Sequence, residues 1–417
     1  MSFPAPGAGP PRVPGDVLRR SWPLAALLAS LTMIGPFAID MYLPAFPAIG
    51  AGLNASPIAV QQTLSTYLFA YAVMMLWHGA LTDALGRRAV ILGGLAVFAV
   101  ATLGCAIAGN IETLWLFRTL QGLSAGTGLV AGRAIIRDSF HGPEAQRLMS
   151  QVTMVFAVAP AIAPVLGGVL LNTFGWRSIF WALLVFVVAV IGWAGKRLPE
   201  THPRELRRPL RPRALWHGYR AVLLRGDFLL LALIPALNFA AFFVYIASAP
   251  AFLIDLLGVT TWGFAWLFLP MIAGVMIGAF LSGRLAGHRS PERTIRLGYA
   301  LLFGGAVANS LICLLAPPMV ALNVAPIMVF TIGSSLVMPS VTLLMLDLFP
   351  GMRGMASSLQ GFVQFGISGV TAGTIAPLLS RSLSALALGM TAFTVASFLL
   401  WLVYQRRARP QLKAWKP

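Results

Sequence analysis

Residues 22–46 read WPLAALLASLTMIGPFAIDMYLPAF, an apolar run that holds a single charged side chain, Asp40. About 20 apolar residues in a helix span the ~30 Å hydrocarbon core of a bilayer, so this run is long enough to cross a membrane. An ionised carboxylate is costly to bury unless it is paired or neutralised. The run therefore predicts a membrane helix in which Asp40 has a functional reason to be present.

The composition extends this prediction to the whole chain. Of 417 residues, 58% are hydrophobic and 10% are charged, and the mean hydropathy is +0.82. Soluble proteins average about 45–50% apolar and about 25% charged residues, so an all-α integral membrane protein is expected. Twelve apolar windows are predicted to span the membrane, at residues 22–48, 57–79, 89–109, 112–133, 148–172, 176–195, 228–253, 261–283, 295–316, 318–346, 354–379 and 383–404.

The net charge of +18 would suit a nucleic-acid-binding protein, but the positions of the charges favour another explanation. Lysine and arginine concentrate in both tails and in the even-numbered loops, while the odd-numbered loops hold only Arg177 and Arg381. Positive residues stay on the cytoplasmic side of a membrane. We therefore expect both termini in the cytoplasm, a location in the inner membrane of a bacterial cell, and no nucleic-acid partner.

Residues 1–21 precede the first window and could belong to a signal peptide. The apolar run is too long for one and lacks a convincing small-residue cleavage site, so we expect a retained helix. The longest hydrophilic segment follows six windows and predicts a linker between two halves. The expected organisation is a cytoplasmic tail at 1–21, a six-helix bundle at 22–195, a cytoplasmic linker at 196–227, a second bundle at 228–404 and a tail at 405–417.

Equivalent loops of the two halves resemble each other. Asp138, Phe140 and Gly142 recur 209 positions later as Asp, Phe and Gly in the segment 346–351, and the segment 79–88 has a weaker echo at 278–287. Repeated six-helix bundles related by pseudo-two-fold symmetry around a central cavity are the architecture of many secondary transporters.

Four segments resemble motifs of the major facilitator superfamily. GALTDALGRR at 79–88 resembles its G-x-x-x-D-x-x-G-R-R/K signature. DMYLP at 40–44, with QTLSTY at 62–67, is similar to the bicyclomycin-resistance type of drug/proton antiporter. RTLQG at 118–122 resembles the fourth-span motif of that group. APVLGG at 163–168 resembles the antiporter motif G-P-x-x-G-G, with Ala163 in place of the first glycine.

The resemblance implies the major facilitator fold and export of drugs or other small amphipathic molecules in exchange for protons, by alternating access. It also implies that Asp40 is the acidic site on the first span. Placing every acidic residue leads to the same side chain, because Asp40 is the one carboxylate of the twelve that falls inside a predicted span.

Arg118 is the clearest basic residue inside a span, and we expect it to take part in proton coupling with Asp40. At about 1.5 Å per residue, each lies roughly 9 Å below the outer boundary of its span. Asp40 would bind a proton and a cationic or polar substrate in competition. Two structural alternatives remain open: a static Asp40–Arg118 ion pair, and a carboxylate bonded to free backbone N–H groups near Pro44.

Other residues are assigned to gating and to the substrate cavity. The charges of the 79–88 loop are expected to pair across the two halves as a latch, although Arg87 and Arg88 could serve topology alone. The gating residues are Gly79, Asp83, Gly86, Arg87 and Arg88, and the helix-bending residues of the fifth span are Pro164, Gly167 and Gly168. Apolar sites with few polar groups suit drug-like molecules, so the expected substrate-binding residues are Phe37, Met41, Tyr67, Tyr71, Gln121, Met154, Asn238, Phe242, Tyr245 and Gln364.

The sequence contains no G-x-x-x-x-G-K-[ST] motif, no metal-ligand spacing and no plausible nucleophile–base pair. We therefore expect no enzymatic activity and no cofactor beyond the proton as coupling ion. The expected partners are a small-molecule substrate, protons and the lipid bilayer, with a monomer as the functional unit. An exporter of an endogenous metabolite, such as an amino acid or siderophore-like product, is the nearest alternative. A membrane enzyme would need clusters of acidic residues at the membrane interface, and this sequence has none. Uptake by proton symport is a third alternative, and only the resemblance of the fifth-span motif to antiporters argues against it.

Overall fold

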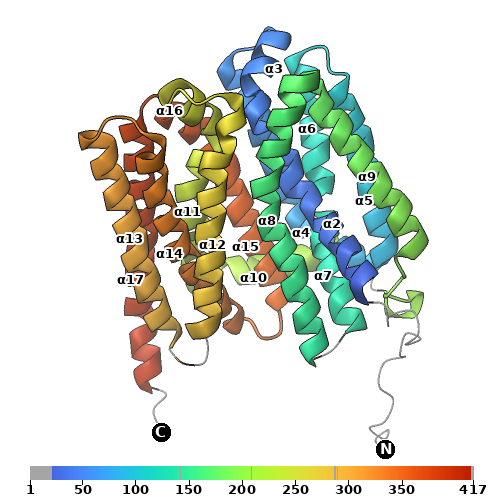
Figure 1. Cartoon of the computed structure of the whole chain (residues 1–417). Coiled ribbons are helices and arrows are strands. Elements are labelled where there is room, and N and C mark those ends of the chain that lie inside the picture. The colour runs from blue at the N-terminus through green and yellow to red at the C-terminus, as the bar shows by residue number, and fades with distance from the viewer. Residues whose placement is uncertain (1–20, 141, 208, 286–287, 289, 415–417) are drawn as a thin grey trace, which may run out of the picture.

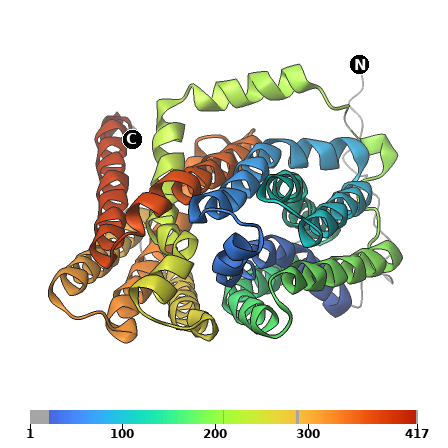
Figure 2. The same ribbon diagram turned by 90° about the horizontal axis from the view of Figure 1, so that it is seen from above.

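A computed structural model describes residues 21–414 except 141, 208, 286–287 and 289. The side chains of a few further residues lie outside the description, at 21–22, 142–147, 150, 153–154, 156–157, 206 and 408–414. Helices make up almost all of the described chain, and none of its residues forms a strand. Figure 2 shows the helices in two groups that stand side by side, one from each half of the chain.

The N-terminal group is formed by α2 (Ser21–Asp40), η1 (Leu43–Ala45), α3 (Phe46–Gly52), α4 (Pro57–Leu85), α5 (Arg87–Ala106), α6 (Ile111–Ala125), α7 (Thr127–Ser139), α8 (Gly142–Phe174) and α9 (Arg177–Arg197). The linker between the groups contains the short turn η2 (Arg204–Leu206) and the helix α10 (Pro212–Leu223), which runs along one edge of the molecule (Figure 2). The linker predicted as a hydrophilic connection therefore carries a helix of its own.

The C-terminal group is formed by α11 (Gly226–Ala247), the π-helical segment η3 (Ala251–Leu256), η4 (Thr261–Phe264), α12 (Ala265–Leu285), α13 (Pro291–Leu315), α14 (Val320–Asp347), α15 (Arg353–Val370), the π-helical segment η5 (Thr371–Ile375), α16 (Ala376–Leu379) and α17 (Leu383–Ala414). The end of the molecule that carries α3 and α16 is called the outer end below. The opposite end, where both described chain ends lie, is called the inner end (Figure 1).

Local sequence sets where several helices begin. Ser56 precedes α4, and its hydroxyl oxygen accepts a hydrogen bond from the N–H of Ala59 at 3.2 Å, with Pro57 in the first turn. The same arrangement starts α13, where Ser290 caps the helix and Pro291 follows. A serine N-cap satisfies an otherwise free N–H, and proline loses no hydrogen bond at the first helical position.

The fold class predicted from the sequence is confirmed. Ten helices or helix pairs of the described chain are long and apolar enough to span a membrane. The pair α6–α7 and the apolar part of α8, Val158–Phe174, supply the remaining crossings, which gives twelve.

Several helices extend beyond the predicted windows. The first span continues through α3 to Gly52, the second through α4 to Leu85, and the fourth through α7 to Ser139 after an interruption at Gly126. Hydropathy marks the apolar part of a helix and does not locate the residue at which the helix ends.

Large apolar side chains cover the outside of both groups. Leu116, Val185, Leu269 and Leu315 are all more than half exposed, as are many others. Exposed apolar surface on this scale would aggregate in water and is stable against lipid chains. The hydrophobic exterior and the helix lengths make the chain a multi-pass membrane protein.

Candidate functional site

Asp40 is the last residue of α2, at a point where the first span is broken. The helix stops at Asp40, a turn follows at Met41 and Tyr42, and the 3₁₀ turn η1 leads into α3. Broken helices within a membrane expose backbone groups that bind ions and substrates in transporters. Asp40 itself is 5% exposed. The turn η1 and the helix α3 follow Asp40, so 12 further residues of this span, to Gly52, lie on its outer side.

Arg118 on α6 is fully buried beside this break. Its Nη1 donates to the carbonyl oxygen of Ala38 and to Oε1 of Gln121, each at 2.9 Å. The guanidinium lies between two aromatic rings, 4.6 Å from the centroid of Tyr42 and 4.5 Å from that of Tyr67. Such cation–π contacts are favourable where the cation has lost its water.

Arg118 and Asp40 lie close together, as a shared layer requires. Within the described residues, however, Arg118 binds the α2 backbone at Ala38, two residues before Asp40, and forms no ion pair with Asp40. The static-pair alternative was therefore wrong for this conformation. The carboxylate of Asp40 is left available to another partner.

Gln121 extends the Arg118 contacts away from Asp40. Its Nε2 donates to Oγ1 of Thr102 on α5 at 2.8 Å, and Cys105 Sγ lies 3.7 Å from its Oε1. Gln121 is fully buried in the N-terminal group, so here it orients Arg118 rather than lining a space between the groups.

Tyr42 and Tyr67 connect the break to α4. The hydroxyl of Tyr42 lies 2.6 Å from Oγ1 of Thr63, and the hydroxyl of Tyr67 donates to Gly35 O at 3.4 Å. The sequence interpretation gave Tyr42 no role. A signal was present, because a tyrosine two residues after Asp40 in an apolar run needs a hydrogen-bond partner when buried.

The two glycines of the fifth span allow close contacts on two sides. A Cβ at Gly167 would overlap the carbonyl oxygen of Met41, in the turn directly after Asp40. A Cβ at Gly168 would lie 2.9 Å from the carbonyl oxygen of Thr261, in the C-terminal group. Pro164 lies inside α8, one turn before this pair, within a helix that continues on both sides of it. The glycines therefore act by close helix approach, which the predicted bending did not include.

The charged residues of the 79–88 loop form a network at the inner end. Arg87 Nη1 binds Asp83 Oδ1 at 2.5 Å and its Nε binds Asp138 Oδ2 at 3.2 Å. Gly86 has a φ of 97°, which favours glycine, and it separates α4 from α5 with a single residue. A Cβ added to Gly79 would meet open space.

The linker closes this network. The backbone N–H groups of Arg87 and Arg88 donate to the carboxylate of Glu200 at 3.0 and 3.3 Å, and Arg88 Nη2 donates to Gly195 O at 2.6 Å. The expected latch across the halves is not formed in this conformation, because these partners belong to the N-terminal group and the start of the linker. Glu200 was missed, since nothing in its sequence context separates it from other loop acids.

Helix α10 is anchored to α4 by one tyrosine. The Tyr219 hydroxyl donates to Leu76 O at 2.6 Å. Burial raises the pKa of Tyr219, so this hydroxyl remains a donor at physiological pH.

The predicted substrate-binding residues do not gather in one place. Phe37 and Met41 line an apolar cavity of about 370 Å³ between α2, α8 and α9. Tyr71 faces the other way, and its ring lies 4.4 Å from that of Phe365 on α15. Gln364, the neighbour of Phe365, is half-buried. Tyr67 lies on the same helix α4, but its ring covers Arg118 inside the N-terminal group, so Tyr71 and Gln364 are the members of this set on the facing sides of α4 and α15.

The candidates on α11 lie mostly inside the C-terminal group. Tyr245 is fully buried and accepts a hydrogen bond from Asn309 Nδ2 on α13 at 2.5 Å. Asn238 is fully buried beside Tyr299 of the same helix α13. The ring of Phe242 packs 4.9 Å from that of Phe239. The side chain of Met154 lies outside the described residues.

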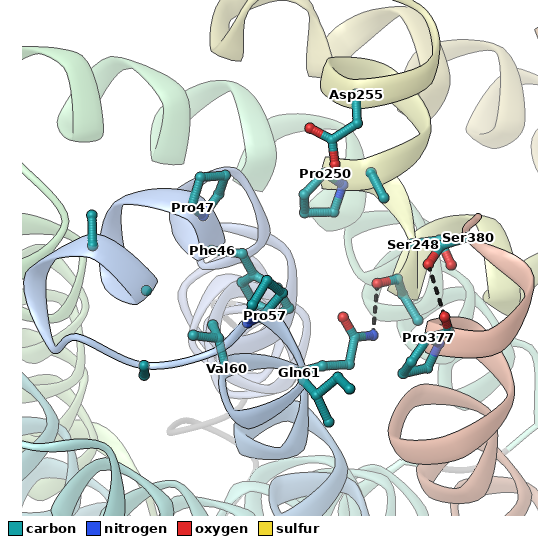
Figure 3. A pocket seen from close by; sticks show the side chains of 16 residues that line it. Phe46, Pro47, Pro57, Val60, Gln61, Ser248, Pro250, Asp255, Pro377 and Ser380 are labelled. Carbon is teal, nitrogen blue, oxygen red and sulfur yellow. Dashed lines mark hydrogen bonds between the residues drawn. The ribbon is translucent and has the colours of Figure 1, made fainter. Parts of the chain in front are cut away.

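A cavity of about 400 Å³ lies at the outer end between the two groups (Figure 3). Prolines from four segments line it, together with Gln61, Ser248, Ser380 and the carboxylate of Asp255. No cluster of three or more potential metal ligands occurs in the part of the chain that is described.

The comparisons with known proteins identify the family and the fold. The sequence profile of the Major Facilitator Superfamily matches residues 28–373. The chain belongs to the Major Facilitator Superfamily. Its relatives are transport proteins, so the expectation that it is a transporter and not an enzyme holds.

Several relatives are named for drug resistance. A bicyclomycin resistance protein homolog of Haemophilus influenzae is 28% identical over 90% of this chain and 94% of its own length. Multidrug resistance protein D of Escherichia coli is 27% identical over 94% and 98%. A chloramphenicol resistance protein of Pseudomonas aeruginosa is 29% identical over 85% and 82%.

Solved structures share the fold. A bacterial homolog of the human lysosomal transporter Spinster, in an inward-facing and occupied conformation, has a TM-score of 0.71 at 19% identity, covering 96% of this chain and 99% of that one. A D-xylose–proton symporter has a TM-score of 0.69 at 16% identity, covering 90% and 97%.

Proposed function

We propose that this protein exports drugs or other small amphipathic molecules across the bacterial inner membrane in exchange for protons, by alternating access. The observation that carries the proposal is Asp40, a buried carboxylate at a helix break that Arg118 leaves without an ion pair. The names of relatives such as the bicyclomycin and chloramphenicol resistance proteins support drugs as the substrate class.

The coupling follows from competition for one carboxylate. With a proton bound, Asp40 is neutral and has no charge to offer a cationic substrate. Without the proton, Asp40 is negatively charged and attracts a cationic substrate. Leaving this charge unpaired in surroundings of low dielectric constant is costly. Binding of either species therefore releases the other, which is the thermodynamic requirement for antiport.

The orientation belongs to the same proposal. Basic residues of the loops and tails concentrate at the inner end, so this end is assigned to the cytoplasm together with both termini. The working units are the six-helix bundles 22–195 and 228–404 of a monomer, with the proton as coupling ion and no further cofactor. The loop 79–88 is assigned to gating, acting through its ties to Glu200 and the linker.

An exporter of an endogenous metabolite is the second candidate. The aromatic and methionine side chains around α2 and α4 would suit either substrate class. The two candidates differ in which compounds the protein removes from a cell.

The test is a drug-susceptibility panel in an efflux-deficient bacterial host that expresses wild type, Asp40→Asn or Glu112→Gln. Glu112 is an exposed carboxylate in the first turn of α6 that lines neither described cavity, and it serves as the carboxylate control. We expect raised tolerance of several amphipathic compounds with wild type and Glu112→Gln, and none with Asp40→Asn at equal expression. If no compound is tolerated better with wild type, drug export is rejected in favour of metabolite export.

A further inference from the structure

The outer third of α4 forms a row of hydrogen bonds to the C-terminal group. Gln61 Nε2 donates to Ala247 O at 2.9 Å, Gln62 Nε2 to Gly373 O at 2.7 Å, and Ser65 Oγ to Gly369 O at 2.8 Å. The three donors are side chains, and the three acceptors are backbone carbonyl oxygens. Contacts of this kind can break and re-form without changing either helix.

Two of the three acceptors lie where the eleventh span departs from α-helical geometry. Gly373 is inside the π-helical segment η5, and Gly369 is two residues before that segment begins. Single π-helical turns are uncommon and occur mostly at functional sites. Both acceptors are glycines, and a Cβ at Gly373 would overlap the hydroxyl of Ser65. The sequence and the local geometry of this segment both bring its backbone close to α4.

A second contact joins the groups at the same end. Thr261 Oγ1 donates to Asn172 Oδ1 of α8 at 3.0 Å, four residues beyond the close approach at Gly168. The two groups are therefore held together at the outer end through both α4 and α8.

The outer cavity stops at this row of bonds. Figure 3 shows the side chain of Gln61 at the cavity, with its hydrogen bond drawn as a dashed line. Ala247 also lines the cavity, yet its side chain is fully buried. Breaking the row would extend the cavity inward along α4, toward Tyr67 and the layer of Arg118.

The same turn of α4 is bonded to the segment that follows Asp40. Thr63, which lies between Gln62 and Ser65 in sequence, is the partner of Tyr42. This turn of α4 thus contacts the segment after Asp40 through Thr63, and it contacts the C-terminal group through Gln62 and Ser65.

We propose that Gln62 and Ser65, with Gln61, are the outer gate of the transporter. Their bonds to the carbonyl oxygens of Ala247, Gly369 and Gly373 hold the outer end closed, and they must break before substrate can leave outward. The inference rests on the proposed alternating access and is independent of which substrate is carried. Gln61, Gln62 and Ser65 are positioning residues, because they act on the state of the gate and need not touch the substrate.

The test measures access to the gate in purified, reconstituted protein without substrate. Ala247→Cys places a buried thiol at the gate itself, on the residue whose carbonyl oxygen accepts from Gln61, and its reaction with a membrane-impermeant maleimide is followed by mass spectrometry of the labelled peptide. The gate variant is Gln62→Ala combined with Ser65→Ala. The matched control is Thr66→Ala, which removes a hydroxyl of the same helix that bonds to Thr63 O within it. Cys105 is fully buried and reports unfolding if it becomes labelled.

Each lost hydrogen bond should shift the ratio of closed to open states about fivefold. We expect the introduced thiol to react at least several times faster in the gate variant, with Thr66→Ala unchanged and Cys105 unreactive. Ser65→Thr, which keeps the hydroxyl, should slow the labelling about fivefold when it replaces Ser65→Ala, and should leave the effect of Gln62→Ala. An unchanged labelling rate in the gate variant overturns the proposal.

A variant on the other side of the gate covers the case in which the double variant unfolds. Gly373→Ala leaves both donors in place but pushes Ser65 away from the acceptor. If the introduced thiol reacts faster while Cys105 stays unreactive, the gate is supported. An unchanged labelling rate rejects the gate. Because the assay uses no substrate, a failed susceptibility panel would reject the proposed function and leave the gate standing.

Discussion

The hydroxyl oxygen of Tyr42 lies 2.6 Å from Oγ1 of Thr63, and this bond joins the turn after Asp40 to α4. Thr63 donates its own hydroxyl hydrogen to Val60 O at 2.5 Å, so Tyr42 is the donor. The bond therefore fixes the orientation of the ring that covers one face of Arg118. In the proposed mechanism, a change of protonation at Asp40 would reach α4, the helix that carries the proposed outer gate, through Tyr42 and Thr63.

Tyr42→Phe removes this hydroxyl and keeps the aromatic ring. One hydrogen bond contributes about 0.5–1.5 kcal/mol, so the protein should remain folded with a slightly lower unfolding temperature. We expect proton-coupled transport in proteoliposomes to fall several-fold, because the link between Asp40 and α4 is lost.

The matched control for that change is Tyr299→Phe. Tyr299 is also a buried tyrosine, and its hydroxyl lies 2.8 Å from Ser397 Oγ in the C-terminal group, far in the chain from Asp40. Its loss should cost similar stability and leave coupling unchanged. Equal transport by the two variants would remove Tyr42 from the coupling route.

Arg118→Lys keeps a positive charge and tests whether the shape of the guanidinium matters. A lysine ammonium cannot lie flat between the rings of Tyr42 and Tyr67 while donating to both Ala38 O and Gln121. We expect the free energy of unfolding to fall by about 2 kcal/mol, the sum expected for a weakened cation–π contact and a lost charged hydrogen bond. Thermal unfolding of the purified protein in detergent measures this loss.

An exposed arginine provides the reference for Arg118→Lys. Arg213→Lys on α10 changes the same residue type where the side chain is exposed, and it should leave the unfolding temperature unchanged. A similar temperature for both variants would show that the stacked geometry around Arg118 contributes little.

Gly167→Ala tests the close contact between α8 and the Asp40 turn. The added methyl group would overlap the backbone of Met41, which cannot move aside without shifting the turn. We expect loss of transport and a fall in stability of about 1–3 kcal/mol, as for overpacked cores. Transport in proteoliposomes and thermal unfolding measure the two effects.

Gly192→Ala on α9 is the control, since a Cβ at Gly192 meets nothing within 4 Å. Alanine also favours a helix more than glycine does, so this variant should be as stable as wild type or slightly more so. Wild-type behaviour of Gly167→Ala would contradict the close approach.

The number of spans could be predicted because hydropathy is a local property. The ends of the first and fourth spans could not, since α3 and the second half of α7 are stabilised by packing against other helices. Asp40 and Arg118 could be found because a charge in an apolar run is visible in one dimension. Their relationship could not be predicted: the ion pair that was left open as an alternative is not formed, and Arg118 binds the backbone of Ala38 instead.

In the candidate site, too, the sequence identifies side chains that could bind a substrate but not the direction in which each of them faces. Phe37 and Tyr71 are similar residues in neighbouring spans, but Phe37 faces an open apolar pocket formed by α2, α8 and α9, and Tyr71 faces Phe365 of the opposite group. The difference depends on how far each helix is rotated about its axis. That rotation is set by contacts of many residues at once, among them Gly167 and Gly168, and a single sequence does not contain it.

The sequence by itself determined that this chain crosses a membrane about twelve times in two similar halves, with one carboxylate inside the spans. Those features follow from the cost of placing polar groups in hydrocarbon, which applies residue by residue. Only the tertiary structure decided that Arg118 leaves Asp40 unpaired, and that Gln62 and Ser65 bind the opposite half. Those features depend on helix rotation and close approach, because a hydrogen bond forms only when two groups from distant parts of the chain come within about 3 Å.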